Sequence, residues 1–173
     1  MDARGLLKAQ MDEAYGFIRA RIEGLTDEEL FWEPAPDCWT VFQRPDGRWT
    51  YHYELPEPTP SPPTTIAWRL NHVATCKVMY HEYAFGPGEL TWDTLEIPGS
   101  AEGMTAMLER GERLLEVDLA SLRTDRELEE HRLTNWGEEW PTWKIFWTMI
   151  RHDAHHGGEI GALRDLYRTR REK

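Results

Sequence analysis

Cysteine is scarce in this sequence, and its scarcity excludes several kinds of protein. The 173 residues include two cysteines, Cys38 and Cys76, and no Cys-x-x-Cys pair. A secreted disulfide scaffold would have more cysteines at regular spacing, and a zinc ribbon or a thioredoxin-type motif would need the missing pair. The sequence also lacks an apolar run long enough to cross a bilayer. Residues 1–7 show no signal-peptide pattern, so we expect an intracellular, cytoplasmic protein.

Positive charge is also in short supply. The sequence has 20 lysines and arginines against 31 aspartates and glutamates, which gives a formal net charge of −11. This balance disfavours nucleic acid as a partner, because contacts to phosphates require clustered basic residues. It disfavours an anionic membrane surface for the same reason. Charge alone says little about the actual partner, since it mainly governs solubility; a small-molecule substrate or thiol is the partner that we expect.

The sequence does contain enough apolar residues, 40% of the total, to form a hydrophobic core. A chain of this length is expected to form a single domain, 1–173, without disulfides or other crosslinks. Apolar residues recur every three or four positions in four segments, at about 3–24, 64–84, 101–122 and 141–167. This pattern predicts an all-α fold, a four-helix bundle.

The segment 33–63 interrupts the helical pattern between the first two long helices. It contains eight prolines, which lack an amide donor and disfavour helix in the preceding residue, so a long loop is expected there. Residues 48–53 are predicted to form a short extended hairpin arm. A short helix through Leu30, beginning with a capping-box pattern at 26–29, precedes the loop. Four aromatic residues in the loop need burial and are expected to pack against the bundle: Trp39, Trp49, Tyr51 and Tyr53.

Two histidines in the last predicted helix are spaced so that they could share a metal ion. His152 and His156 are four residues apart, which places both on one face of a helix with Cβ atoms roughly 5–6 Å apart. They are in register with apolar residues, so they point toward the core, where an ion would satisfy one nitrogen of each ring. A pair with this spacing is more often ordinary than metal-binding. His155 lies about 100° around the helix from His156 and is expected to face a neighbour or solvent.

His72 is the best candidate for a third ligand. It lies in the middle of the second long helix, between Trp68 and Cys76 on the same face. Three protein ligands and one open position are typical of catalytic zinc sites. Considered in isolation, His72 is more often a hydrogen-bonded core histidine. The other histidines are expected at the surface: His52, His81 and His131.

Three residues near these histidines have roles that the sequence leaves open. Cys76 would be a fourth ligand or a redox partner in one interpretation, and a small buried apolar residue in the more common one. Asp153 and Glu159 would orient ligand imidazoles through hydrogen bonds, or act as solvated charges or interhelical partners.

Four tryptophans are expected to pack at the beginning of the last helix: Trp136, Trp140, Trp143 and Trp147.

Five stretches of the sequence, in their order and spacing, resemble the DinB/YfiT-like metalloprotein superfamily, and within it an actinobacterial-type branch. They are L-T-D-E-E-L at 25–30, W-E-P-A-P at 32–36, C-W-T at 38–40, I-A-W-R-L-N-H at 66–72 and H-D-A-H-H-G-G-E-I at 152–160. The resemblance covers nearly the whole chain. It implies a four-helix bundle with up-down-down-up connections, often assembled as a homodimer. It also implies a metal site made by His72, His152 and His156.

The resemblance further implies zinc or nickel as the metal and a range of activities. Some members are thiol transferases that use bacillithiol, mycothiol or glutathione, and others isomerise maleylpyruvate. Many members have Arg and Gln just after the last ligand, where this chain has Gly157 and Glu159.

The leading functional hypothesis is therefore a divalent-metal-dependent S-transferase with a mycothiol-like co-substrate, or a related hydrolase. No catalytic side chain is predicted. The alternatives are a non-enzymatic bundle protein that binds metal or a small ligand, and a dimerisation module in which the metal only joins helices.

Overall fold

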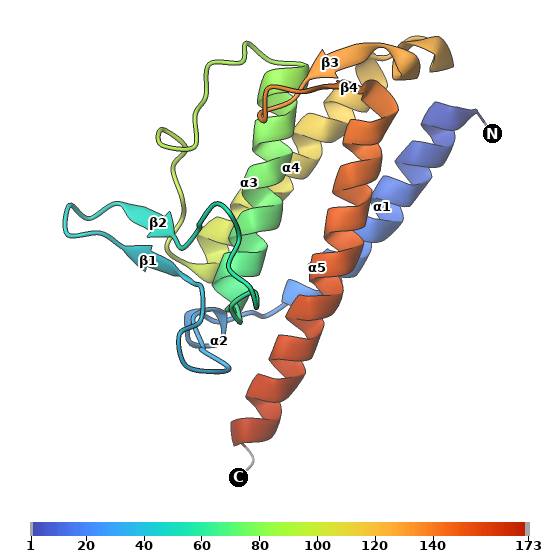
Figure 1. The fold of residues 1–173 in the computed structure, drawn as a ribbon. Helices are drawn as coiled ribbons and strands as arrows, with labels where there is room; N and C mark the ends of the chain where they lie inside the picture. Colours follow the sequence, from blue (N-terminus) through green and yellow to red (C-terminus); the bar gives the residue numbers. More distant parts are fainter. Residues whose placement is uncertain (1, 172–173) are drawn as a thin grey trace.

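The computed structural model describes residues 2–171 and is mostly helical (Figure 1). Residues 1, 172 and 173 of the predicted domain lie outside this range. The predicted long helices are present with small shifts at their ends: α1 (Ala3–Ile22), α3 (Ile66–Ala84), α4 (Ala101–Ser121) and α5 (Thr142–Arg171). The predicted short helix is α2 (Asp27–Leu30). The prediction of a mainly helical protein is confirmed.

The four long helices pack along one another. α1 packs mainly against α5, and α3 packs against both α4 and α5. Figure 1 shows that α1 and α5 run in one direction and that α3 and α4 run in the other. Because α3 and α4 are consecutive and parallel, the segment 85–100 must return along the length of the helices before α4 begins.

The starts of these helices follow from their capping residues. Thr26, Thr65 and Ser100 each accept a hydrogen bond from a backbone amide three residues later. Such caps satisfy amides that have no partner in the first helical turn. The cap of α3 is Thr65 and not the adjacent Thr64.

Two buried clusters of charged residues join the helices. On α3, Lys77 contacts the Glu112 carboxylate of α4 and lies 2.6 Å (Nζ–Oδ2) from Asp153 of α5. On α5, Arg164 donates hydrogen bonds to both carboxylate oxygens of Glu29, at 2.7 and 2.9 Å. Buried charges require such partners. These contacts therefore hold α5 at a defined position against α2, α3 and α4.

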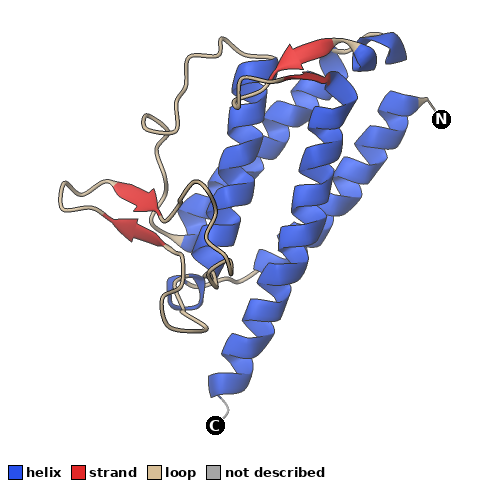
Figure 2. Cartoon of the chain, viewed as in Figure 1, coloured by secondary structure: helices blue, strands red, loops and turns tan. Residues whose placement is uncertain are grey.

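Two antiparallel hairpins lie outside the helices (Figure 2). In the first, β1 (Val41–Gln43) pairs with β2 (Trp49–Tyr51), so the expected arm at 48–53 contributes one of its strands. The second consists of β3 (His131–Leu133) and β4 (Glu139–Pro141), preceded by a 3-10 helix, η1 (Asp125–Glu129). This second hairpin was not predicted, and it lies in the polar connection before α5.

None of the helices within residues 2–171 is long and apolar enough to cross a membrane.

Candidate metal centre

The fold brings together the three histidines that the sequence singled out. His72 is on α3, and His152 and His156 are on α5. One ring nitrogen from each lies within 4.8 Å of the others. The three ring centroids are 5.0 to 5.4 Å apart. α3 and α5 pack directly against each other, so the three rings face one another across the helix interface.

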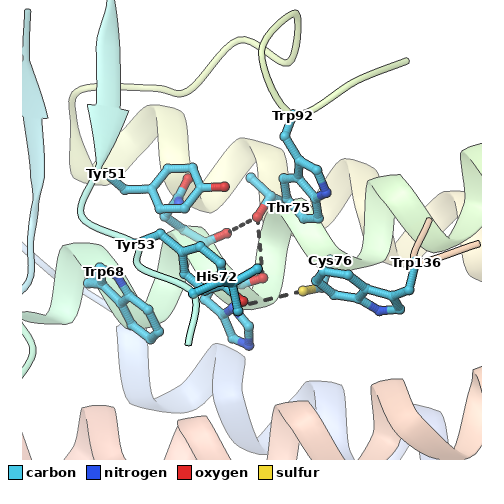
Figure 3. Close-up of a pocket in the computed structure, with 10 residues that line it drawn as sticks. Tyr51, Tyr53, Trp68, His72, Thr75, Cys76, Trp92 and Trp136 are labelled. Carbon is cyan, nitrogen blue, oxygen red and sulfur yellow. Dashed lines mark hydrogen bonds between the residues drawn. The ribbon is translucent and has the colours of Figure 1, made fainter. Parts of the chain in front are cut away.

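The ring of His72 is held by contacts along α3. It stacks on Trp68, with ring centroids 5.3 Å apart and an interplanar angle of 9°. On its other side, the Cys76 sulfur lies 3.9 Å from His72 Nδ1 (Figure 3). Burial raises the pKa of the Cys76 thiol to about 12. With no metal bound, the thiol is therefore protonated at neutral pH. Among the described residues its sulfur is also not one of the donor atoms that gather with the three rings, which favours the interpretation of Cys76 as a small buried residue.

The ring of His156 is oriented by a carboxylate. Its Nδ1 lies 2.6 Å from Oε2 of Glu159, and Glu159 also forms an ion pair with Arg69 at 3.3 Å. A carboxylate can only accept a hydrogen bond, so Nδ1 of His156 carries the proton and Nε2 keeps its lone pair. Carboxylates commonly orient metal-binding histidines in this way. The orienting role considered for Glu159 fits this geometry.

His152 has a polar atom without a partner. Its Nδ1 is buried and makes no hydrogen bond to any part of the chain that the structure describes. Buried polar atoms are nearly always paired, and each exception needs an explanation. A cation at the centre of the three rings would explain the arrangement, so the residues present fit a divalent metal ion.

Burial also keeps all three rings neutral. It is the main cause that lowers the pKa of His72 to about 4, with the charge of Arg69 adding to it. Burial and the neighbouring histidines lower the pKa of His152 to about 3 and that of His156 to about 2. Neutral imidazole is the form that binds metals. The site would therefore offer three lone pairs without first releasing protons at neutral pH.

The remaining histidines lie elsewhere. His155 is exposed, with 63% of its side chain accessible and its Nε2 3.5 Å from Glu159. The surface position expected for His81 is wrong, because its Nδ1 lies 2.8 Å from Oδ2 of Asp118 in a largely buried pair. Asp153 faces Lys77 and not the imidazoles. Of the two roles considered for Asp153, the structure therefore favours that of an interhelical partner over that of orienting an imidazole.

An apolar cavity of about 220 Å³ opens beside His72 (Figure 3). Its floor is α3, and its walls come from three separate segments: β2 with the loop that follows it, the loop between α3 and α4, and the turn between β3 and β4. Sequence reasoning missed two wall residues, Trp92 and Trp136. Trp136 was expected to pack at the beginning of α5, but it lies between β3 and β4 and lines the cavity. Trp143 and Trp147 are exposed, so their predicted packing is also wrong.

With this geometry in view, comparisons with known proteins identify the family. A sequence model of the DinB superfamily matches residues 10–160. The chain belongs to the DinB superfamily. A crystal structure described as a conserved protein of locus from Enterococcus faecalis is similar over 96% of this chain and 97% of that chain, with a TM-score of 0.58 and 14% identity. At that identity the likeness supports the fold only.

No curated protein matches the sequence. The range matched by the DinB model contains His72, His152 and His156 together with Arg69 and Glu159. The DinB match therefore covers the whole candidate metal centre.

Proposed function

We propose that this DinB protein is a divalent-metal-dependent enzyme whose ion is held by His72, His152 and His156. The observation that carries the proposal is the convergence of three neutral, largely buried histidine rings beside an apolar cavity. Imidazole ligands suit zinc and nickel, and we propose one of these as the metal. No fourth protein ligand is proposed, because among the described residues the Cys76 sulfur is not one of the donor atoms that lie together with those of the three histidines.

The reaction we propose is transfer of a low-molecular-weight, mycothiol-like thiol to an electrophile, or a related hydrolysis. A divalent ion, when bound, lowers the pKa of a coordinated thiol or water and makes it nucleophilic near neutral pH. In the transfer, the thiol sulfur forms a bond to the electrophilic carbon, the leaving group departs with its electron pair, and the thiol proton passes to solvent.

The chain's own residues position the reactants and exclude water. Trp68 stacks on His72 and fixes its ring, and Glu159 fixes the ring of His156. Tyr51 and Trp92 cover the apolar cavity next to His72. A reactive group held there would be shielded from bulk water, which strengthens electrostatic interactions within the site.

A second candidate function is binding of a metal or small ligand without catalysis. One observation favours it: among the described residues that line the cavity, none is an aspartate, glutamate or lysine that could act as a general acid or base. An exchangeable position on the metal would favour the enzyme, whereas a closed coordination shell would favour a structural ion.

The ligand assignment is tested by metal content. Alanine variants of His72, His152 and His156 should each lose most of the ion after dialysis against metal-free buffer, as measured by elemental analysis. His155→Ala is the matched control, since its exposed side chain lies one residue from His156. Loss of the ion in His155→Ala with retention in His156→Ala would show that the assignment is wrong.

The chemical proposal is tested with cobalt in place of the native ion. Mycothiol, bacillithiol and glutathione are titrated separately into the cobalt-loaded protein. The preferred thiol should produce a thiolate-to-cobalt charge-transfer band, and conjugation of an electrophile should require both metal and thiol. If no thiol perturbs the cobalt spectrum, the transferase proposal fails.

We also propose that the protein forms a homodimer. Large apolar side chains are exposed on two helices, including Leu6 and Phe17 on α1 and Val117 on α4. Exposed apolar patches commonly mark protein interfaces. Analytical ultracentrifugation at high micromolar concentration should therefore show a dimer, and a purely monomeric protein would refute this part of the proposal.

A further inference from the structure

A second cavity borders the apolar cavity beside His72. Its volume is about 540 Å³, and its lining comes from the β1–β2 hairpin with the residues that follow it and from the segment that connects α3 with α4. Three aromatic residues line both cavities: Tyr51, Tyr53 and Trp92. Figure 3 shows the side chains of Tyr51 and Trp92 extending over α3 from these two segments. The second cavity therefore adjoins the place where the proposed substrate would react.

Two arginines supply positive charge to the second cavity. Arg44 and Arg48 both line it, and they face each other across the hairpin turn, where the Arg44 amide donates to the Arg48 carbonyl at 2.8 Å. Nη2 of Arg44 donates to Oγ1 of Thr50 at 3.3 Å, and Nη2 of Arg48 donates to the backbone carbonyl of Asp93 at 2.7 Å. Thr50 and Asp93 also line the cavity, so these contacts hold both guanidinium groups at its edge. A guanidinium has five N–H groups, and each contact uses one.

Neither Arg44 nor Arg48 has a carboxylate partner within residues 2–171. The ion-paired arginines of that range are others: Arg4, Arg19, Arg69 and Arg164. Like charges that face each other across a hairpin are destabilising. Features that reduce stability in this way are typical of binding sites, where a ligand supplies the missing contact. The missing contact of this arginine pair is an oxyanion.

One acidic residue limits how much negative charge the cavity can accept. Asp93 lines the second cavity with Arg44 and Arg48, so the three ionised side chains leave a net charge of one positive unit. A single carboxylate balances that charge, and a guanidinium binds a carboxylate through two parallel hydrogen bonds. The cavity beside His72, in contrast, has no carboxylate, ammonium or guanidinium group in its described lining. The two cavities together suit a molecule with an apolar body and one carboxylate.

We infer that the substrate is an amphiphilic monoanion, whose apolar part occupies the cavity beside His72 and whose carboxylate binds Arg44 and Arg48. The two arginines then determine specificity by charge, and Asp93 disfavours ligands with more than one negative charge. The inference rests on the proposed function in taking the apolar cavity as the place of the reacting group. Binding of the carboxylate by the two arginines does not require the ion.

NMR titration of chelator-treated, isotope-labelled protein tests the inference. Removing the metal matters because a bound ion would attract the carboxylate directly. The probes are phenylacetate, hydrocinnamate and phenylbutyrate, each compared with its uncharged primary amide. An exposed ion pair contributes up to about fivefold in affinity, so the best-fitting acid should bind about fivefold more tightly than its amide. Nuclear Overhauser effects from its phenyl ring should reach Thr75 and Trp136, which line the apolar cavity but not the second one.

Three variants should shift the preference for the acid in opposite directions. Arg44→Gln and Arg48→Gln should each reduce it, whereas Asp93→Asn should increase it, because the amide keeps the shape and removes the repulsion. Structural damage to the exposed hairpin would weaken the binding of acid and amide alike. Arg168→Gln and Asp165→Asn are the matched controls: they make the same changes of charge on exposed residues of α5 that line neither cavity, so they should leave the preference unchanged.

The outcomes separate this inference from the proposed function. Equal affinity for acid and amide, no binding of any pair, or a preference that persists in both arginine variants would overturn the inference, even if the three histidines hold a metal. A reduced preference in Asp93→Asn, or a phenyl ring that contacts neither Thr75 nor Trp136, would overturn it as well. A preference that depends on Arg44 and Arg48, in a protein that holds no metal when zinc is supplied, would support the inference while the proposed function fails.

Discussion

Replacing Lys77 with methionine tests how the helices that carry the metal centre are held together. Lys77 is 1% exposed and lies against the carboxylates of Glu112 and Asp153. Methionine is also an unbranched side chain but lacks the charge, so two carboxylates would be left buried without a cation. Removing one partner of a buried ion pair costs about 3–5 kcal/mol. We expect the free energy of unfolding to fall by about that amount at pH 8.

The size of this loss should depend on pH. Burial raises the pKa of Glu112 and of Asp153, and Lys77 is the main group that opposes the rise. Without Lys77 both pKa values rise further, so the native state binds protons more tightly than the unfolded state. Stability then falls as the pH rises from the unfolded carboxyl pKa of about 4 through the raised native values. The variant should therefore be closest to wild type in acid.

Guanidinium denaturation of chelator-treated protein at pH 5 and pH 8 measures both effects. Lys8→Met is the matched control, because Lys8 also pairs with two carboxylates, those of Asp12 and Glu116, but at the surface. Exposed pairs contribute about 0–1 kcal/mol, so this control should change little at either pH. A Lys77→Met variant that loses no more stability than Lys8→Met, or loses as much at pH 5 as at pH 8, would refute the reasoning.

Glu159→Gln should weaken metal binding about tenfold, because it replaces the carboxylate that orients His156; equilibrium dialysis measures this, and an unchanged affinity would contradict it. Arg164→Met should lower the free energy of unfolding by about 3–5 kcal/mol, since it leaves Glu29 buried without its partner; a loss below about 1 kcal/mol in denaturant melts would contradict this expectation. Chelator-treated protein should lose stability as the pH falls below about 6.5, because the unfolded histidines take up protons before the buried ones do; thermal melts across this range check it, and constant stability would rule it out.

The helices and the three histidines could be predicted because their signals are local. Apolar spacing sets which face of a helix is buried, and two residues four apart share a face wherever that helix packs. The caps at Thr65 and Ser100 act on amides three residues away. Such information lies within a few residues of sequence. It identified His152 and His156 as neighbours, and His72 followed from its place among apolar residues on α3.

Contacts between distant segments could not be predicted in the same way. Arg164 pairs with Glu29 across 135 positions, and the sequence has no period that links them. Glu29 looked like part of a helix cap, and its carboxylate instead serves Arg164. The pairing of His81 with Asp118 and the position of Trp92 in the cavity wall also depend on how elements meet in three dimensions. For these residues, the neighbouring sequence does not indicate which partner each one contacts.

The β3–β4 hairpin is an intermediate case, because a signal was present and was not used. Its turn contains Gly137, which has φ +79°, and the β1–β2 turn contains Gly47 with φ +85°. Glycine adopts such angles without steric cost, and a glycine between two short alternating segments is a recognised hairpin signal. Applied to residues 131–141, this rule would have predicted the hairpin. It would have moved Trp136 from the beginning of α5 to a turn.

The long helices and the segments that connect them make different contributions to the site. The three proposed ligands lie on α3 and α5, which the Lys77–Asp153 contact joins within the core. Groups on packed helices are held more precisely than groups on loops, as a metal site requires. Most walls of the cavity come from outside the long helices: Tyr51 ends β2, and Trp92 and Trp136 lie in loops. Loops tolerate changes that cores do not. Helix residues would therefore determine whether an ion is held, and the residues of the surrounding segments would determine which molecules reach it.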